Sequence, residues 1–215
     1  MSTVVVFGAT GYAGGQITEE LLNRGHSVIG VARDISKLPE HPQLTATAGS
    51  AYDDAFVRDV SKGADIIVLA IPSIPPGSPE LKDVVPTMLR AAAETGARLG
   101  VVGGTGSLAS SPGGPLVLDL PEWPAEYLPE AQAHARALDV LRNTTVDADW
   151  FYLSPPMLYG SFNPGTRTGT FRIGDDVLLR DENGVSQISG PDYAIAFTDE
   201  LETPKHHRTR FTVAY

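Results

Sequence analysis

Three glycines near the N-terminus have the spacing of a phosphate-binding loop. Gly8, Gly11 and Gly14 follow the β-branched and aromatic run 4–7, and residues 16–22 read as the helix that comes next. A strand, a tight turn and a helix in this order place backbone N–H groups and the positive end of a helix dipole against a phosphate. We therefore expect a dinucleotide to bind here, with a plain glycine-rich turn as the alternative. The residues of this loop are Gly8, Ala9, Thr10, Gly11, Tyr12, Ala13 and Gly14.

A charged pair after the second predicted strand can distinguish the two nicotinamide dinucleotides. Residues 27–32 read as that strand, and Arg33 and Asp34 follow it directly, with Lys37 further along. In dinucleotide-binding folds an acidic residue at this position binds the ribose 2′-hydroxyl, whereas an Arg suits a 2′-phosphate. Arg33 therefore favours NADP(H), while Asp34 keeps NAD(H) open. A solvated charge cluster is the alternative for Arg33 and Lys37.

Small and hydroxyl-bearing residues follow the fifth predicted strand, 98–102. Gly103 and Gly104 open this loop and leave room for close approach to a nicotinamide ring. We expect Ser107 or Thr105, further along the loop, to line the site, and Ser107 is a candidate catalytic hydroxyl. An ordinary turn is the alternative.

One histidine is a second catalytic candidate. His134 lies on the predicted helix 129–142, on the same face as Leu138 and Leu141. This face should look toward the cleft, so His134 is either a functional group or a hydrogen-bonded core residue.

The chain lacks the residue pair by which short-chain dehydrogenases usually exchange a proton with an alcohol. That pair is a Tyr followed four residues later by a Lys that lowers the pKa of the Tyr. No Tyr-x-x-x-Lys occurs anywhere in the sequence. Hydride transfer to a flavin or quinone needs less help, because water can supply the proton. The missing pair therefore disfavours alcohol oxidation.

The elements that would position these residues alternate between strands and helices. Further strands are predicted at 44–48, 65–71 and 149–153, and further helices at 53–60 and 81–95. This alternation predicts an α/β fold with a Rossmann-type, doubly wound parallel sheet. Pro86 lies inside the last of these helices, so we expect a bend or a later helix start there.

Two strand ends should border the bound dinucleotide, because the ends of central parallel strands line the cofactor crevice. At the end of the strand 65–71 these residues are Leu69, Ala70, Ile71 and Pro72. After the strand 149–153 they are Pro155, Pro156 and Met157, whose prolines would hold the backbone rigidly beside the nicotinamide.

The final third of the chain reads as a small C-terminal lobe, residues 160–215, within one NAD(P)-binding domain that spans residues 1–215. Short strands are predicted at 168–173, 177–179 and 185–188, a hairpin turn at 181–184, a helix at 192–201 and a last strand at 210–214. We expect this lobe to cover the C-terminal edge of the sheet. No metal site is expected at His206 and His207, because adjacent residues on an extended chain point opposite ways.

Composition narrows the possible partners. The formal net charge of −10 argues against a nucleic-acid partner, since neutralising phosphates needs surplus Lys and Arg. The absence of cysteine excludes disulfides and thiolate metal sites. No apolar run approaches the length of about 20 residues that a membrane span needs, and no signal-type segment begins the chain. We therefore expect a soluble cytoplasmic protein that acts on a small molecule.

Several stretches spread over the chain share the sequence pattern of one protein family. They are residues 8–14, 102–108, 149–156, 164–169, 188–194 and 210–213, and the last three are the most distinctive. Over nearly its whole length the chain resembles the atypical short-chain dehydrogenase/reductase relatives described as NADH-flavin reductases, a group similar to NmrA-like proteins and biliverdin reductase B.

The resemblance implies a Rossmann-type sheet, bound NAD(P)H and hydride transfer to a flavin or similar planar acceptor. It places the loop 8–14 at the pyrophosphate, Arg33 at the 2′-phosphate and Ser107 near the nicotinamide, with residues 155–157 under the carboxamide.

Two positions depart from the family pattern. At the adenine, where many members carry an Asp, this chain has Ser50 beside Ala51. On the late helix, Leu138 stands where biliverdin reductase B has a His, and His134 lies one turn earlier.

Three functions remain open at this point. The first is an NAD(P)H-dependent reductase of a flavin or quinone, with NADP(H) favoured and the flavin as substrate rather than a tightly bound group. The second is a redox sensor of the NmrA type that binds the dinucleotide and acts through a protein partner. The third is an isomerase or epimerase, which the missing Tyr-Lys pair disfavours.

Overall fold

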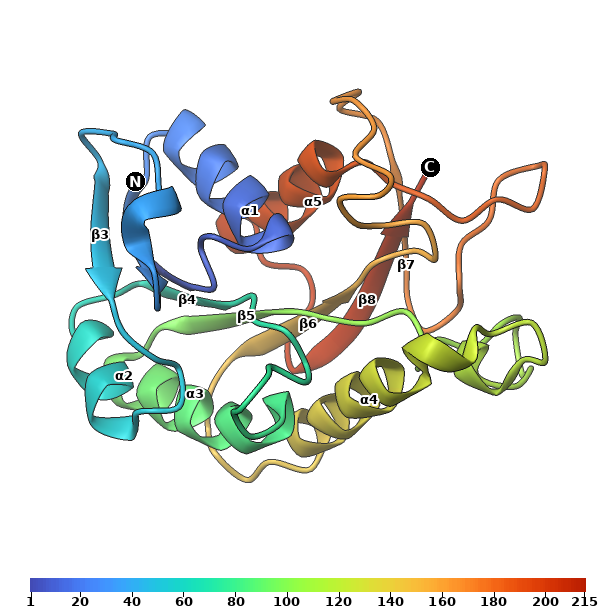
Figure 1. The fold of residues 1–215 in the computed structure, drawn as a ribbon, viewed down its shortest axis with the longest axis horizontal. Coiled ribbons are helices and arrows are strands. Elements are labelled where there is room, and N and C mark those ends of the chain that lie inside the picture. The colour runs from blue at the N-terminus through green and yellow to red at the C-terminus, as the bar shows by residue number, and fades with distance from the viewer.

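Eight strands form one sheet in the order β3-β2-β1-β4-β5-β6-β8-β7 in the computed structural model, which describes residues 1–215 (Figure 1). The strands are β1 Thr3–Phe7, β2 Ser27–Ala32, β3 Leu44–Ala48, β4 Ile66–Leu69, β5 Arg98–Val102, β6 Trp150–Ser154, β7 Arg172–Gly174 and β8 Thr209–Ala214. All neighbours are parallel except β7 and β8. The order of the first six strands is that of a Rossmann sheet, so the predicted fold is confirmed.

Helices cover both faces of the sheet (Figure 1). One face carries α1 Tyr12–Asn23 and α5 Gly190–Glu202, and the other carries α2 Asp54–Val60, α3 Leu81–Thr95 and α4 Leu128–Arg142. Short 3₁₀ helices lie at Ile35–Lys37, Val117–Asp119 and Ala125–Tyr127. Successive strand residues point to opposite faces, so each strand supplies side chains to two separate cores. In β1, for example, Val5 and Phe7 pack with α3, whereas Val4 and Val6 pack with α1.

One helix start differs from the prediction, and another agrees with it. α1 begins at Tyr12, inside the glycine motif, because Gly11 already has the extended backbone of an N-cap. α3 runs from Leu81 to Thr95 as predicted and continues through Pro86, so of the two alternatives for Pro86 the later start is wrong. Glu80 and Asp83 form a capping box that fixes this start.

The C-terminal segment joins the central sheet. The expected strand at 168–173 reduces to β7, and those at 177–179 and 185–188 are absent, leaving isolated bridges at Val177 and Gln187. β8 pairs with β6 and is buried on both sides from Arg210 to Ala214, as expected for an interior parallel strand. α5 packs against α1. Most of the regular structure in 160–215 is therefore part of the main sheet and its helical layer.

The sheet has its topological switch point between β1 and β4. After β1 the chain enters α1 on one face, and after β4 it enters α3 on the other face, so a crevice opens at the carboxyl ends of these two strands. This is the edge at which the predicted site residues gather.

Candidate functional site

The glycine loop packs directly against the end of β4. Gly8 has φ +87°, and a Cβ atom on it would lie 2.2 Å from the carbonyl oxygen of Ala70. A Cβ on Gly14 would lie 2.1 Å from the oxygen of Gly8. Both positions therefore need glycine: Gly8 for its backbone conformation and close contact, and Gly14 for the close approach of α1 to the loop.

The first turn of α1 offers unpaired hydrogen-bond donors. The Gly15 N–H is the first to bond within the helix, to the oxygen of Gly11 at 2.8 Å. The backbone N–H groups of Tyr12, Ala13 and Gly14 have no acceptor in the protein, and Gly11 supplies no side-chain cap. Three free donors at a helix N-terminus, with no carboxylate in the first turn, favour an anion such as a pyrophosphate.

A cavity of about 240 Å³ extends from this loop toward β2 and β3. Its lining residues are Phe7, Gly8, Thr10, Gly11, Val31, Ala32, Arg33, Gly49, Ser50, Ala51, Tyr52, Ala70, Ile71, Pro72, Pro75 and Ser78. The predicted adenosine-side residues, Arg33, Ser50 and Ala51, are thus brought together. The Ser50 hydroxyl accepts the backbone N–H of Tyr52 at 3.2 Å.

The two charged residues after β2 have different roles. Arg33 is exposed on the cavity wall and forms no hydrogen bond or ion pair within the protein. The Asp34 carboxylate accepts the Ser36 N–H at 3.0 Å and its hydroxyl at 2.7 Å, and these bonds lower the pKa of Asp34. Asp34 is therefore occupied in capping the 3₁₀ helix that follows, whereas Arg33 is free to bind a ligand.

A second cavity, of about 410 Å³, lies at the ends of β5 and β6. It shares Gly11, Ala70, Ile71 and Pro72 with the first, so the two form one crevice across the edge of the sheet. Its other lining residues are Tyr12, Ala13, Val102, Gly103, Gly104, Thr105, Gly106, Trp123, Tyr127, Glu130, Ala131, His134, Pro155, Met157, Tyr159, Gly160 and Phe162.

Large aromatic side chains form one wall of the second cavity. Trp123 and Tyr127 come from the segment before α4, and Tyr159 and Phe162 from the segment after β6. Tyr127 and Phe162 are 54% and 70% exposed, which is unusual for side chains of this size and leaves flat apolar surface available to a ligand. Nothing in the sequence marks this wall, because no periodic pattern links the two segments.

The glycines after β5 make room for the protein's own side chains. A Cβ on Gly103 would lie 2.2 Å from the Tyr152 ring, and one on Gly104 would lie 2.8 Å from His134. The Tyr152 hydroxyl accepts the Gly104 N–H at 2.9 Å and lies 3.3 Å from Nδ1 of His134. The loop thus lines the cavity while resting on Tyr152 and His134.

His134 lines the cavity as a neutral imidazole. Desolvation by the surrounding protein lowers the pKa of His134 from 6.5 to about 4. Burial likewise raises the pKa of Tyr152, so its phenol keeps its proton. At neutral pH His134 therefore carries no charge toward a ligand.

The two predicted hydroxyls after β5 differ in position. Thr105 lines the cavity, and its hydroxyl lies 2.9 Å from the oxygen of Pro155 and 3.0 Å from that of Pro156, to which it donates. Ser107 is not among the lining residues, and its hydroxyl accepts a hydrogen bond from Nη1 of Arg210 at 3.2 Å. Thr105 therefore holds the end of β6 beside the cavity.

Four further predicted residues also lie behind the cavity surface. Ala9, Gly14 and Leu69 are buried, and Pro156 presents its carbonyl to Thr105 rather than a surface to the cavity. Leu69 faces the core between the sheet and α3, because it is in phase with Ile67 on the strand. The remaining predicted cofactor residues line one or both cavities.

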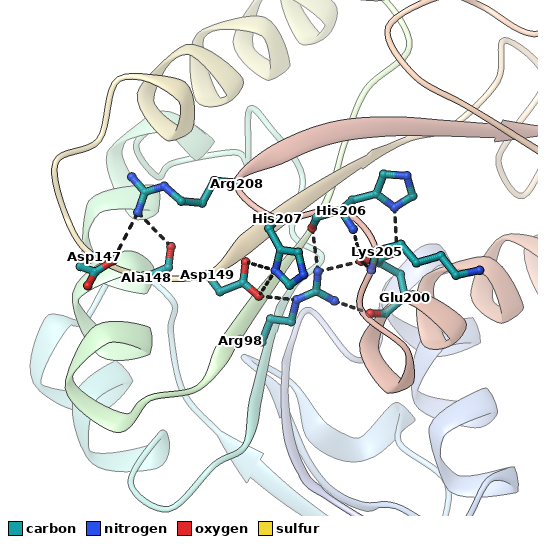
Figure 2. Close-up of polar contacts among 9 residues, drawn as sticks. All are labelled: Arg98, Asp147, Ala148, Asp149, Glu200, Lys205, His206, His207 and Arg208. Carbon is teal, nitrogen blue, oxygen red and sulfur yellow. Dashed lines mark hydrogen bonds and ion pairs between the residues drawn. The ribbon is translucent and has the colours of Figure 1, made fainter.

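The adjacent histidines near the C-terminus belong to an ion network at the opposite edge of the sheet (Figure 2). His206 Nδ1 lies 2.7 Å from Glu200, and His207 Nδ1 lies 3.0 Å from Asp149. Arg98, at the start of β5, joins both carboxylates, with its Nε 2.9 Å from Asp149 and its Nη2 2.7 Å from Glu200. The network ties the β5 and β6 starts to the segment before β8.

Comparison with known proteins gives the same fold and cofactor class. The model of a family described as NAD(P)H-binding matches residues 8–201. The Bacillus subtilis protein YwnB is 37% identical over 97% of this chain and 96% of its own length. A solved structure described as a putative epimerase, from Bacteroides thetaiotaomicron, has a TM-score of 0.88 at 35% identity, covering 100% of this chain and 97% of that one. Another, described as a putative NADH-flavin reductase, from Streptococcus pneumoniae, has a TM-score of 0.84 at 30% identity, covering 100% and 99%. None of the helices here is both long enough and apolar enough to cross a membrane.

Proposed function

Because the chain belongs to the NAD(P)H-binding family, we propose that it is an NAD(P)H-dependent reductase that transfers hydride to a flavin, a quinone or a similar planar acceptor. The observation that carries the proposal is the aromatic cavity of about 410 Å³ that continues from the dinucleotide crevice. Flat apolar walls of this kind suit a planar ring. The neighbour described as a putative NADH-flavin reductase agrees with this assignment.

The residues of the crevice fit a nicotinamide dinucleotide. The free N–H groups of Tyr12 and Ala13, which line the crevice, would bind the pyrophosphate, and the close packing of Gly8 keeps that part of the crevice open. The unpaired guanidinium of Arg33 would bind a 2′-phosphate, which favours NADP(H) over NAD(H). When bound, the reduced dinucleotide supplies the hydride.

The protein's part in the reaction is orientation and exclusion of water. The aromatic wall would hold the acceptor ring against the nicotinamide end of the crevice, while Thr105 fixes the backbone after β6. Neutral His134 is a poor proton donor, and no lysine lines the cavity, so solvent supplies the proton that a reduced flavin or quinone takes up.

An epimerase is the second candidate, because a neighbour of high structural similarity is described as a putative epimerase. Epimerases of this fold class rely on acid–base groups at the substrate carbon. The absence of a Tyr-x-x-x-Lys pair and the apolar cavity wall favour the reductase.

The test is a reaction between purified protein, NADPH and an added acceptor. Oxidation of NADPH, followed at its absorbance, is expected with a flavin or a quinone, and NADH should be the weaker donor. If NADPH binds but is not consumed with any of the added acceptors, the reductase proposal is contradicted and a redox sensor is favoured. The cytoplasmic location stays a prediction.

A further inference from the structure

The two ends of the crevice carry opposite charge. We call the cavity of about 240 Å³ the dinucleotide cavity and the cavity of about 410 Å³ the acceptor cavity. Arg33 is the one cation that lines the dinucleotide cavity, and the residues that line the acceptor cavity include no Lys or Arg. The charged group of the acceptor cavity is instead the carboxylate of Glu130. His134, the remaining titratable base on its wall, is neutral because burial lowers its pKa to about 4.

The segment before α4 makes the rim of the acceptor cavity acidic. It contributes Trp123 and Tyr127 to the wall, and next to them in sequence stand the exposed carboxylates Glu122 and Glu126. No Lys or Arg occurs between residues 99 and 135 to compensate these charges. An anion that approaches this rim meets several carboxylates without a partner cation.

One cation adjoins the lining of the acceptor cavity at Met157, in a part of the chain separate from the acidic segment 122–130. The Arg180 guanidinium contacts the sulfur of Met157, but its Nη1 donates to the oxygen of Gly184 at 2.8 Å. Arg180 keeps its charge, but its bond to Gly184 holds the guanidinium at the turn 181–184, and no cation of the segment 99–135 accompanies Glu122, Glu126 and Glu130.

We propose that the acceptor is an uncharged planar redox ring, such as an unphosphorylated flavin or a quinone, and that the acidic rim discriminates against acceptors that carry a phosphate. This inference rests on the proposed reductase function. In the reaction the acceptor ring gains two electrons and one proton as hydride from NAD(P)H, and one further proton from water. Riboflavin is thereby reduced to dihydroriboflavin, while the dinucleotide becomes NAD(P)⁺.

Riboflavin and FMN provide a direct comparison, because they share one ring system and differ by a phosphate. With NADPH saturating at low ionic strength, we expect kcat/KM to be about tenfold higher for riboflavin, the ratio that a few carboxylates at about 10 Å from a phosphate would produce. Added salt should narrow the ratio, since it screens exposed charges. Equal kcat/KM for the two flavins, or preference for FMN, would overturn the proposal.

A double variant tests whether the rim causes the preference. Glu122→Gln combined with Glu126→Gln removes two carboxylates that do not line the cavity, and it should raise kcat/KM for FMN while kcat for riboflavin stays unchanged. The control is Asp59→Asn combined with Glu94→Gln, which changes the net charge equally near the C-terminal ends of α2 and α3, at the opposite edge of the sheet. A flavin ratio that the rim variant leaves unchanged, or that the control changes as much, would refute the role of the rim.

Binding separates this proposal from the reductase function itself. If no acceptor is reduced, the reductase function fails. The discrimination against a phosphate, which we call the charge rule, is then measured as the dissociation constants of riboflavin and FMN, by titrating flavin fluorescence with NADP⁺-saturated protein. Tighter binding of riboflavin than of FMN supports the charge rule, and equal dissociation constants refute it.

Discussion

The phenol oxygen of Tyr152 lies 3.3 Å from Nδ1 of His134 and accepts the backbone N–H of Gly104 at 2.9 Å. This contact joins β6, α4 and the loop after β5 in a layer directly behind the acceptor cavity. Since Tyr152 is fully buried, the layer cannot shift without exposing the core. His134 is therefore both a cavity residue and part of the packing.

Acid should destabilise the protein through His134. Its pKa is lowered from 6.5 to about 4 in the folded protein, so the unfolded chain binds a proton over this range while the folded protein does not. The free energy of unfolding should fall as the pH falls from 6.5 to 4, by up to about 3 kcal/mol from this group. Urea unfolding at pH 7.5 and 4.5 measures the effect. The free energy of unfolding of His134→Gln should fall correspondingly less between these pH values, and an equal fall in both proteins would contradict the prediction.

The glycine loop should tolerate alanine at one position and not at another. In Gly8→Ala the new methyl group would lie 2.2 Å from the oxygen of Ala70 on a backbone with φ +87°, at a cost of about 1–3 kcal/mol or more. Gly15→Ala is the control, because its Cβ would lie 3.6 Å from the nearest atom and alanine favours a helix. Thermal unfolding should show a lower Tm for Gly8→Ala alone, and NADPH titration should show weaker binding. A stable Gly8→Ala with normal affinity would remove the proposed role of this contact.

Arg33 should select between the two dinucleotides. Arg33→Ala is expected to raise the Kd for NADPH by about 10- to 100-fold, as loss of a charge-assisted bond implies, and the Kd for NADH by less than about threefold. Lys37→Ala removes the same charge from a nearby residue that does not line the cavity, and it should change neither value by more than about threefold. Equal weakening of both dinucleotides in Arg33→Ala would mean that Arg33 does not bind the 2′-phosphate.

The two hydroxyls after β5 should differ in their effect on turnover. Thr105→Val keeps the side-chain shape but releases the oxygens of Pro155 and Pro156, so kcat with riboflavin should fall by about three- to tenfold. Ser107→Ala should stay within about twofold, because the Ser107 hydroxyl faces Arg210. Steady-state kinetics of both variants decides the matter. A fall of about 100-fold in Ser107→Ala would establish Ser107 as the catalytic group that the sequence suggested.

The ion network around Arg98 should stabilise the fold without affecting the cofactor (Figure 2). Arg98→Met leaves the carboxylate of Glu200, which is 4% exposed, without its arginine partner, and the free energy of unfolding should fall by about 3–5 kcal/mol. Arg58→Met is the control, because the ion pair of Arg58 with Glu94 is exposed and should contribute less than about 1 kcal/mol. Urea unfolding compares the two, and NADPH affinity of the folded protein should be unchanged in both. A similar fall in the free energy of unfolding in both variants would show that burial of the network adds nothing to its contribution to stability.

The sequence by itself determined the sheet and the dinucleotide end of the site. The alternation of apolar strands with amphipathic helices predicted a doubly wound parallel sheet, because parallel strands need a helix for each crossover. The glycine spacing located the loop at the switch point, and at Gly8 and Gly14 only glycine permits the close approach of the loop to β4 and α1. Arg33 could also be located from the sequence, because it directly follows the apolar run that forms β2.

Only the tertiary structure decided the acceptor end. Trp123 and Tyr127 line the same cavity as Tyr159 and Phe162 from a separate segment, and no local pattern in the sequence links the two segments. The direction in which a side chain points was equally hidden from the sequence. Leu69, at the end of β4, faces the core, and Ser107, in the loop after β5, faces Arg210. The insertion of β8 beside β6 follows from burial on both of its faces, which its short apolar run did not distinguish from an edge strand. Periodicity and spacing are local properties of the chain, whereas the lining of a cavity depends on which side chains the packed core leaves exposed.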